Sequence, residues 1–158
     1  MKYKSPYTKT LALLLSVISM IFIFTSCTNK AEPPEDKAFS LVMDFSPTTV
    51  QVGKKITFKA ILKNSEHESF TLEHPAELIH ISVVKAEDYK QADIPLLTDT
   101  VLSESNIAPH GQIEEFYDFK PTEKGEYILK AYTVFSIEGK ETTKDYFYEC
   151  DEITITVK

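Results

Sequence analysis

Three histidines, His67, His74 and His80, lie among four glutamates within residues 66–80 and are the first side chains to consider for chemistry. Imidazole nitrogens and carboxylate oxygens are ligands for Zn²⁺ and other divalent metals. Their spacing matches neither HxH nor HExxH, and His80 alternates with two isoleucines, which places it on the opposite face of a strand from them. We interpret these histidines as separate surface residues and predict no metal; a metal carrier built on residues 66–80 is the alternative.

Nucleophilic and acid–base groups show no catalytic pattern. No serine lies in a GxSxG motif, and the four glycines form no phosphate-binding loop. Glu114 and Glu115 are adjacent, so a strand would point them to opposite faces. Cys150 lies in a strand-like stretch close to aromatic residues, and we expect a small, buried, apolar side chain there. The sequence therefore predicts a protein that is not an enzyme and uses no cofactor.

The N-terminal residues have the features of an export signal. Lys2, Lys4 and Lys9 precede an apolar run at residues 11–24, LALLLSVISMIFIF, and no acidic residue occurs before position 32. A membrane-spanning helix needs about 20 apolar residues, whereas a run of 14 has the size of the apolar region of a signal peptide. Residues 1–26 are therefore predicted to be a signal peptide, with an uncleaved membrane anchor as the alternative.

A cysteine follows this leader directly. Residues 24–27, Phe-Thr-Ser-Cys, resemble the lipobox of bacterial lipoprotein precursors, with Phe24 where leucine is usual. The resemblance implies cleavage before Cys27 and a diacylglyceryl group on its sulfur. Two acyl chains suffice for stable membrane anchoring. The resemblance thus implies a protein held at the cell membrane, on the extracytoplasmic side, through the lipid on Cys27.

The residues after the cysteine have the composition of a spacer. Residues 27–38 are predicted to comprise the lipidated cysteine and a polar, extended linker that includes Pro33 and Pro34. Ten extended residues, 28–37, span roughly 33–36 Å. This length would hold the following domain away from the bilayer.

Charge excludes one class of partner. The chain has 17 lysines, no arginine and 24 acidic residues, a net charge of −7, and loss of the three leader lysines would leave −10. Nucleic-acid binding depends on basic side chains that neutralise phosphates. We therefore predict no nucleic-acid partner.

From residue 39 onward, apolar and polar residues alternate with a period of two. The alternating runs are residues 39–45, 56–62, 79–83, 127–131 and 153–157. Turn residues separate them, and no segment keeps a helical period. This pattern predicts one all-β domain, residues 39–158, folded as an antiparallel immunoglobulin-like β-sandwich. Tyr127, just after Gly125, predicts a tyrosine corner, in which the tyrosine hydroxyl binds a backbone group upstream.

Four short stretches mark strand ends and turns: FKAILKN at 58–64, FTL at 70–72, IAPHG at 107–111 and KGEY at 124–127. Together they resemble the immunoglobulin-like fold of the bacterial intracellular proteinase inhibitor family, although the tryptophan and the glycine-rich middle loop of that family are absent. The resemblance implies proteinase inhibition through a loop, for which residues 94–105 are the candidate. This loop has one proline and no disulfide to stiffen it, so we expect a protease to cut it rather than to be blocked.

Two neighbouring tyrosines are a candidate interaction surface. In a strand, Tyr146 and Tyr148 share one face and Phe147 takes the other. Either one of these faces belongs to the core and leaves only one or two tyrosines exposed, or the tyrosines form an adhesive surface for a protein or glycan partner.

The connection at residues 87–109 is a second candidate. It carries Leu96, Leu97 and Leu102 among acidic and polar residues. Loops of this length are usually functional or contain a short strand, for which residues 99–103 are the candidate.

These observations predict a membrane-anchored, extracytoplasmic lipoprotein that acts as a non-catalytic binding module for an envelope protein. A proteinase-inhibitor-like domain and a metal or small-ligand carrier are the alternatives.

Processing at Cys27 is testable by intact-mass spectrometry of the protein from the membrane fraction. We expect the mass of residues 27–158 plus the lipid. Cys27→Ala should abolish the lipid increment, whereas Cys150→Ala should retain it. A retained leader, or a mature chain without lipid, would contradict the prediction.

Overall fold

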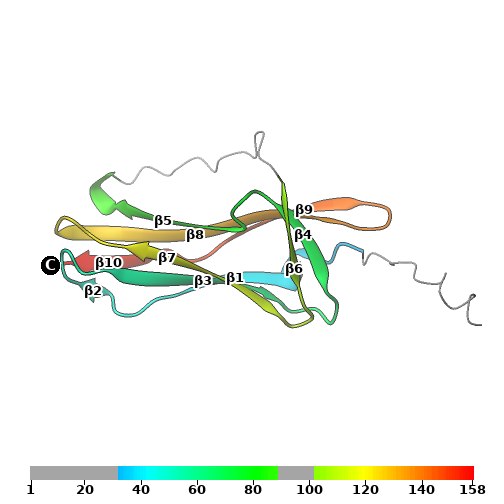
Figure 1. The fold of residues 1–158 in the computed structure, drawn as a ribbon, viewed down its shortest axis with the longest axis horizontal. Coiled ribbons are helices and arrows are strands. Elements are labelled where there is room, and N and C mark those ends of the chain that lie inside the picture. The colour runs from blue at the N-terminus through cyan, green and yellow to red at the C-terminus, as the bar shows by residue number, and fades with distance from the viewer. Residues whose placement is uncertain (1–31, 89–101) are drawn as a thin grey trace, which may run out of the picture. The chain divides into compact units, whose positions relative to one another are not determined.

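The computed structural model describes residues 32–88 and 102–158, which belong to one compact unit, Ala31–Lys158. Its regular structure is almost entirely β (Figure 1). The strands are β1 (Phe39–Asp44), β2 (Thr49–Val50), β3 (Ile56–Asn64), β4 (Phe70–His74), β5 (Ile79–Lys85), β6 (Ser103–Ile107), β7 (Gln112–Phe119), β8 (Gly125–Glu138), β9 (Thr143–Glu149) and β10 (Ile153–Val157). Two 3-10 turns, η1 (Asp36–Ala38) and η2 (Ala86–Asp88), complete the described elements. No helix in these two ranges is long and apolar enough to cross a membrane.

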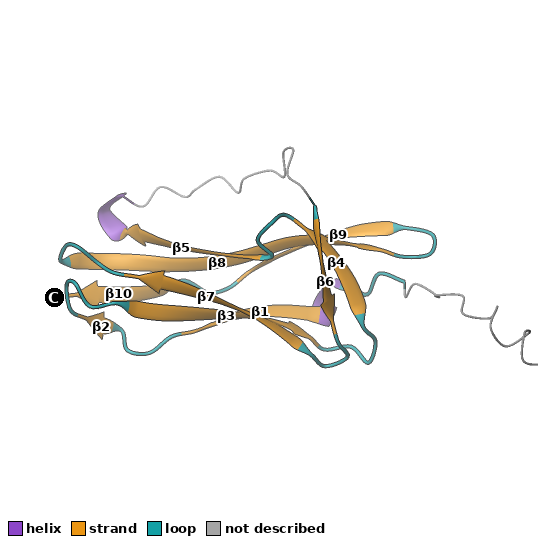
Figure 2. Ribbon diagram, viewed as in Figure 1, coloured by secondary structure: helices purple, strands orange, loops and turns teal. Residues whose placement is uncertain are grey.

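The strands form two sheets (Figure 2). The smaller sheet has the order β1-β3-β7, and the larger has the order β2-β10-β8-β4-β6, with β5 and β9 also paired to β8. The short β2–β10 pair is parallel, and the other pairs are antiparallel. Buried side chains from both sheets share the same clusters. The predicted β-sandwich is therefore confirmed.

The long strand β8 organises the larger sheet. Every second side chain from Tyr127 to Ile137 points into the core. β9 and β10 follow one another along one side of β8, while β5 and β4 pair along the other. The sequence predicted only residues 127–131 of this strand, because Thr133 breaks the apolar pattern. Thr133 is fully buried all the same, since its hydroxyl donates a hydrogen bond to the Leu78 carbonyl at 2.6 Å.

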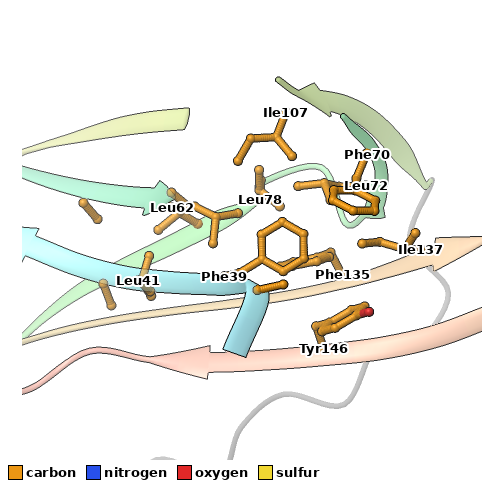
Figure 3. Packing of buried hydrophobic residues seen from close by; sticks show 14 of the residues in the cluster. Phe39, Leu41, Leu62, Phe70, Leu72, Leu78, Ile107, Phe135, Ile137 and Tyr146 are labelled. Atoms are coloured by element: carbon orange, nitrogen blue, oxygen red, sulfur yellow. The ribbon is translucent and has the colours of Figure 1, made fainter. Parts of the chain in front are cut away.

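Aromatic rings fill the larger of the two core clusters (Figure 3). Phe39, the first residue of β1, makes edge-to-face contacts with Phe70, Phe135 and Tyr146 at centroid distances of 5.6, 5.2 and 5.6 Å. Such pairs add about 0.5–1.5 kcal/mol each beyond the burial of their area. The second cluster surrounds the fully buried Phe58 and includes Val50, Tyr127, Leu129, Ile155 and Val157.

Residues 32–38, which we call the N-terminal strap, pack against the domain instead of extending as a spacer. The Tyr146 hydroxyl donates a hydrogen bond to the Pro34 carbonyl at 2.7 Å, and the Tyr148 hydroxyl donates one to the Asp36 carbonyl at 2.6 Å. The predicted spacer therefore ends earlier than residue 38, because tyrosines of β9 satisfy backbone carbonyls of the strap.

Further contacts hold the strap in the same place. Lys144 Nζ donates to the Pro34 carbonyl at 2.9 Å and forms an ion pair with Asp36 at 2.8 Å. The turn after β8 approaches so closely that a Cβ atom at Gly139 would clash with the ring of Pro33. A side chain other than hydrogen at Gly139 would therefore have to displace the strap.

The tyrosine corner predicted from the sequence is confirmed. The Tyr127 hydroxyl donates a hydrogen bond to the Glu123 carbonyl at 3.1 Å, and the ring is buried in the second cluster. The contact ties the turn before β8 to the strand itself.

Tyr127→Phe should therefore lower the free energy of unfolding by about 0.5–1.5 kcal/mol, the net value of one such hydrogen bond. Tyr117→Phe is the matched control, because Tyr117 is exposed and should change stability by less than about 0.5 kcal/mol. Urea unfolding of the full chain measures both variants. Equal midpoints for the wild type and Tyr127→Phe would show that the corner does not stabilise the domain.

Candidate interaction surface

On β9, the face that carries Tyr146 and Tyr148 points inward, and the face that carries Phe147 points outward. Tyr146 is only 3% exposed and Tyr148 is half-buried, whereas Phe147 is 44% exposed. Burial raises the pKa of Tyr146 to about 12, and it also raises the pKa of Tyr148. Of the two interpretations, the adhesive tyrosine surface is contradicted, because Tyr146 belongs to the core and both tyrosines lie beneath the N-terminal strap.

Phe147 continues an aromatic row on the outer face of the larger sheet. Its ring lies 6.3 Å from that of Tyr132 on β8, and the Tyr132 ring stacks at 4.9 Å on His80 of β5. These rings contact one another across three strands, which is the arrangement by which cross-strand pairs stabilise a sheet. The row therefore has a structural role, with the Phe147 ring at its exposed end.

Of the three leucines in the long connection, only Leu102 lies among the described residues. Leu102 is 62% exposed and directly precedes β6, while Leu96 and Leu97 lie outside the described residues. β6 begins at Ser103, the last residue of the predicted strand 99–103, and pairs with β4. The end of the predicted inhibitory loop, residues 103–105, is therefore part of a sheet.

The histidines of residues 66–80 do not come together. His67 Nδ1 lies 2.8 Å from His110 Nε2, while His80 stacks on an aromatic ring elsewhere. His74 differs from the predicted surface position: it is buried, and its Nε2 lies 2.8 Å from Ser105 Oγ. Within the two described ranges, no three His, Cys, Asp or Glu side chains are grouped so that they could hold a metal ion.

Cys150 is buried, as predicted from its apolar surroundings. It follows the end of β9, and its backbone N–H donates to the Ala131 carbonyl at 3.1 Å. Burial raises the pKa of the thiol. A buried thiol of this kind is a poor nucleophile, because the reactive form is the thiolate.

The most exposed aromatic side chain of the described residues lies on β7. Phe116 is 63% exposed, and the neighbouring Tyr117 is 38% exposed. Ile113 and Phe119 of the same strand contact the core, so the odd-numbered residues of β7 face the opposite sheet and the even-numbered residues face outward. This surface could not be predicted from periodicity, since the mixed run QIEEFYDF lacks a clear alternation; the adjacent Phe and Tyr among acidic residues are the only signal of it in the sequence.

β7 is an edge strand. It pairs with β3 along its whole length, from Gln112 to Phe119, and within the described part of the chain no strand pairs with its other side. β5, at an edge of the facing sheet, likewise pairs only with β8 there. The space between the two sheets therefore opens sideways between β5 and β7.

A cleft of about 170 Å³ occupies this opening, and we call it the lateral cleft. Its lining residues are Glu77, Ile79, Ile81, Glu115, Phe116 and Tyr117. Glu77 lies 3.3 Å from His80 Nδ1, whereas Glu115 has no ion pair or side-chain hydrogen bond with any residue that the structure describes. The cleft thus combines apolar walls with a carboxylate that has no basic partner among residues 32–88 and 102–158.

Comparison with known proteins gives no assignment of family. The sequence matches no protein family and no curated protein. Similar solved structures include a CARDB domain from Pyrococcus furiosus in complex with di-metal ions, with 13% identity, a TM-score of 0.46, and coverage of 82% of this chain and 92% of that chain. The sporulation control protein of Bacillus subtilis has 13% identity, a TM-score of 0.43 and coverage of 77% and 49%. A β-glucosidase from Listeria innocua has 9% identity, a TM-score of 0.34 and coverage of 71% and 16%. No ligand or activity is transferred from matches at this level.

Proposed function

We propose that this protein is a membrane-anchored, extracytoplasmic lipoprotein whose β-sandwich is a non-catalytic module that binds another envelope protein. In this proposal, the lipid on Cys27 is the anchor, and the edge of β7 with the lateral cleft is the binding surface. The exposed aromatic side chains on β7, whose second edge has no partner strand among the described residues, are the observation that carries the proposal.

The N-terminal strap sets the length of chain between such an anchor and the domain. With the strap docked on β9, only residues 28–31 lie between Cys27 and the described chain, and four extended residues span at most roughly 13–14 Å. The anchor proposed at Cys27 would therefore hold the domain close to the bilayer.

The lateral cleft lies partway along β8. Its residues Ile79 and Ile81 pair with Thr133 and Ala131, near the middle of that strand. The cleft is therefore roughly 15–25 Å along β8 from the β8–β9 turn, which lies beside the strap.

The surroundings of the candidate reactive groups support a non-catalytic role. The thiol of Cys150 is buried with its pKa raised, and the imidazole of His74 is engaged by Ser105. The lateral cleft offers carboxylates and apolar groups, and its lining includes no serine, cysteine or histidine nucleophile.

Exposed aromatic side chains beside an open edge favour binding to a protein. Aromatic residues are enriched in protein interfaces, where their large area is buried at little entropic cost. Strand edges are commonly protected by charged side chains, proline or bulges, and β7 carries three acidic residues but no lysine or proline. These acids disfavour pairing with a strand of like charge and leave the edge suited to a partner of opposite charge.

Site-specific photo-cross-linking in intact host cells tests this proposal. A photoreactive phenylalanine analogue replaces Phe116 in one variant and Phe147 in the control, which is also exposed but lies on the outer face of the other sheet. We expect a defined membrane-fraction protein to cross-link from position 116 and not from 147. Cross-linking from neither position, or only from 147, would contradict the proposal.

A further inference from the structure

We propose that the partner segment is an extended strand with a lysine or arginine side chain, which adds to the free edge of β7 and places its cationic group against Glu115. This inference rests on the proposed function, because it specifies the chemistry of the partner at the same surface.

The backbone of β7 is suited to pairing with a further strand. In an antiparallel pair, both backbone groups of a residue point to the same side, so alternate residues of β7 direct their N–H and C=O groups away from β3. Eight residues, from Gln112 to Phe119, form this edge. Edges of this kind bind extended segments by main-chain hydrogen bonds, while pockets for alternate side chains determine specificity.

The distribution of charge on β7 favours a basic partner. The two outward carboxylates already have basic partners: Glu114 lies 3.4 Å from Lys59, and Asp118 lies 2.6 Å from Lys55. Glu115 points to the other face, into the lateral cleft, and has no such partner among the described residues. A cation supplied from outside would complete the pattern along the strand.

The lining of the cleft around this carboxylate suits a long basic side chain. Ile79, Ile81 and Tyr117 provide apolar walls, and Glu77 adds a second carboxylate at the rim. A lysine or arginine side chain fits both components, because its methylene groups cover apolar surface while its charged end binds carboxylates. An anionic or purely apolar side chain would leave Glu115 without a counter-ion.

The same carboxylate disfavours a second copy of the chain as the occupant. A second β7 strand paired with the first would bring another copy of Glu114, Glu115 and Asp118 to the same edge. Inward-pointing charges at sheet edges oppose pairing between identical strands. A basic segment converts this repulsion into attraction.

Binding of a labelled peptide tests the inference. The probe is an eight-residue fluorescent peptide of alternating valine and lysine, and the control peptide has glutamate in place of lysine. Fluorescence anisotropy with the full chain in detergent micelles should show saturable binding of the lysine peptide and none of the glutamate peptide. No saturable binding of the lysine peptide would overturn the inference.

Substitutions on the protein locate the site. Glu115→Gln should weaken binding of the lysine peptide about tenfold or more, since it removes a charge-assisted contact. Glu149→Gln is the matched control, an exposed strand glutamate on β9, and should change the affinity less than about twofold. Glu115→Lys should bind the glutamate peptide instead of the lysine peptide. This gain of binding would show that the charge-reversal variant is folded and that residue 115 contacts the peptide. Equal affinities of the wild type and Glu115→Gln would overturn the inference.

The peptide and cross-linking results separate the two proposals. If cross-linking from position 116 persists while the lysine peptide does not bind, the binding module stands and only the basic strand is excluded. If cross-linking from position 116 is absent as well, the proposed function fails with it.

Discussion

The uninterrupted alternation of buried and more exposed side chains along β8 is the constraint on which the rest of the domain depends. Its inward residues form the floor of both core clusters, and a shift of one residue would turn all of them to solvent. Both sides of this strand are occupied, by β9 and β10 on one side and by β5 and β4 on the other. In the described part of the chain, the smaller facing sheet has three strands, and its last strand, β7, has one edge without a partner strand. The lateral cleft is a consequence of this unequal division of strands.

The aromatic cluster around Phe39 connects the core to the N-terminal strap. Phe39 packs on Tyr146, and the hydroxyl of Tyr146 binds the strap at Pro34. Tyr148 repeats the arrangement one step along the strand, with its ring 6.2 Å from Phe39 and its hydroxyl on Asp36. The rings of both tyrosines thus pack in the apolar core, while their hydroxyls donate hydrogen bonds to the strap. In this way the chain that enters the domain is fixed before β1 begins.

Much of the fold could be predicted from local pattern, and the errors have physical causes. The runs 39–45, 56–62 and 153–157 alternate cleanly, and they fall in β1, β3 and β10. Alternation shows which residues share a face, but not which face is buried; the burial of Tyr146 could not be predicted, because its cover is the strap, more than a hundred residues away in sequence. β7 was missed for a related reason. Only half of its inward positions, Ile113 and Phe119, reach the core, and Glu115 lies at the mouth of the cleft.

The central claim is that β7 has a free edge available to another strand. Residue-resolved amide hydrogen exchange of the full chain in detergent micelles tests this claim most directly. The account predicts an alternation along residues 112–119, in which amides directed to β3 are protected and the amides between them exchange as fast as exposed surface amides. Uniform protection along β7 in the free protein would contradict the account, because another part of the chain or a second copy would then already cover the edge.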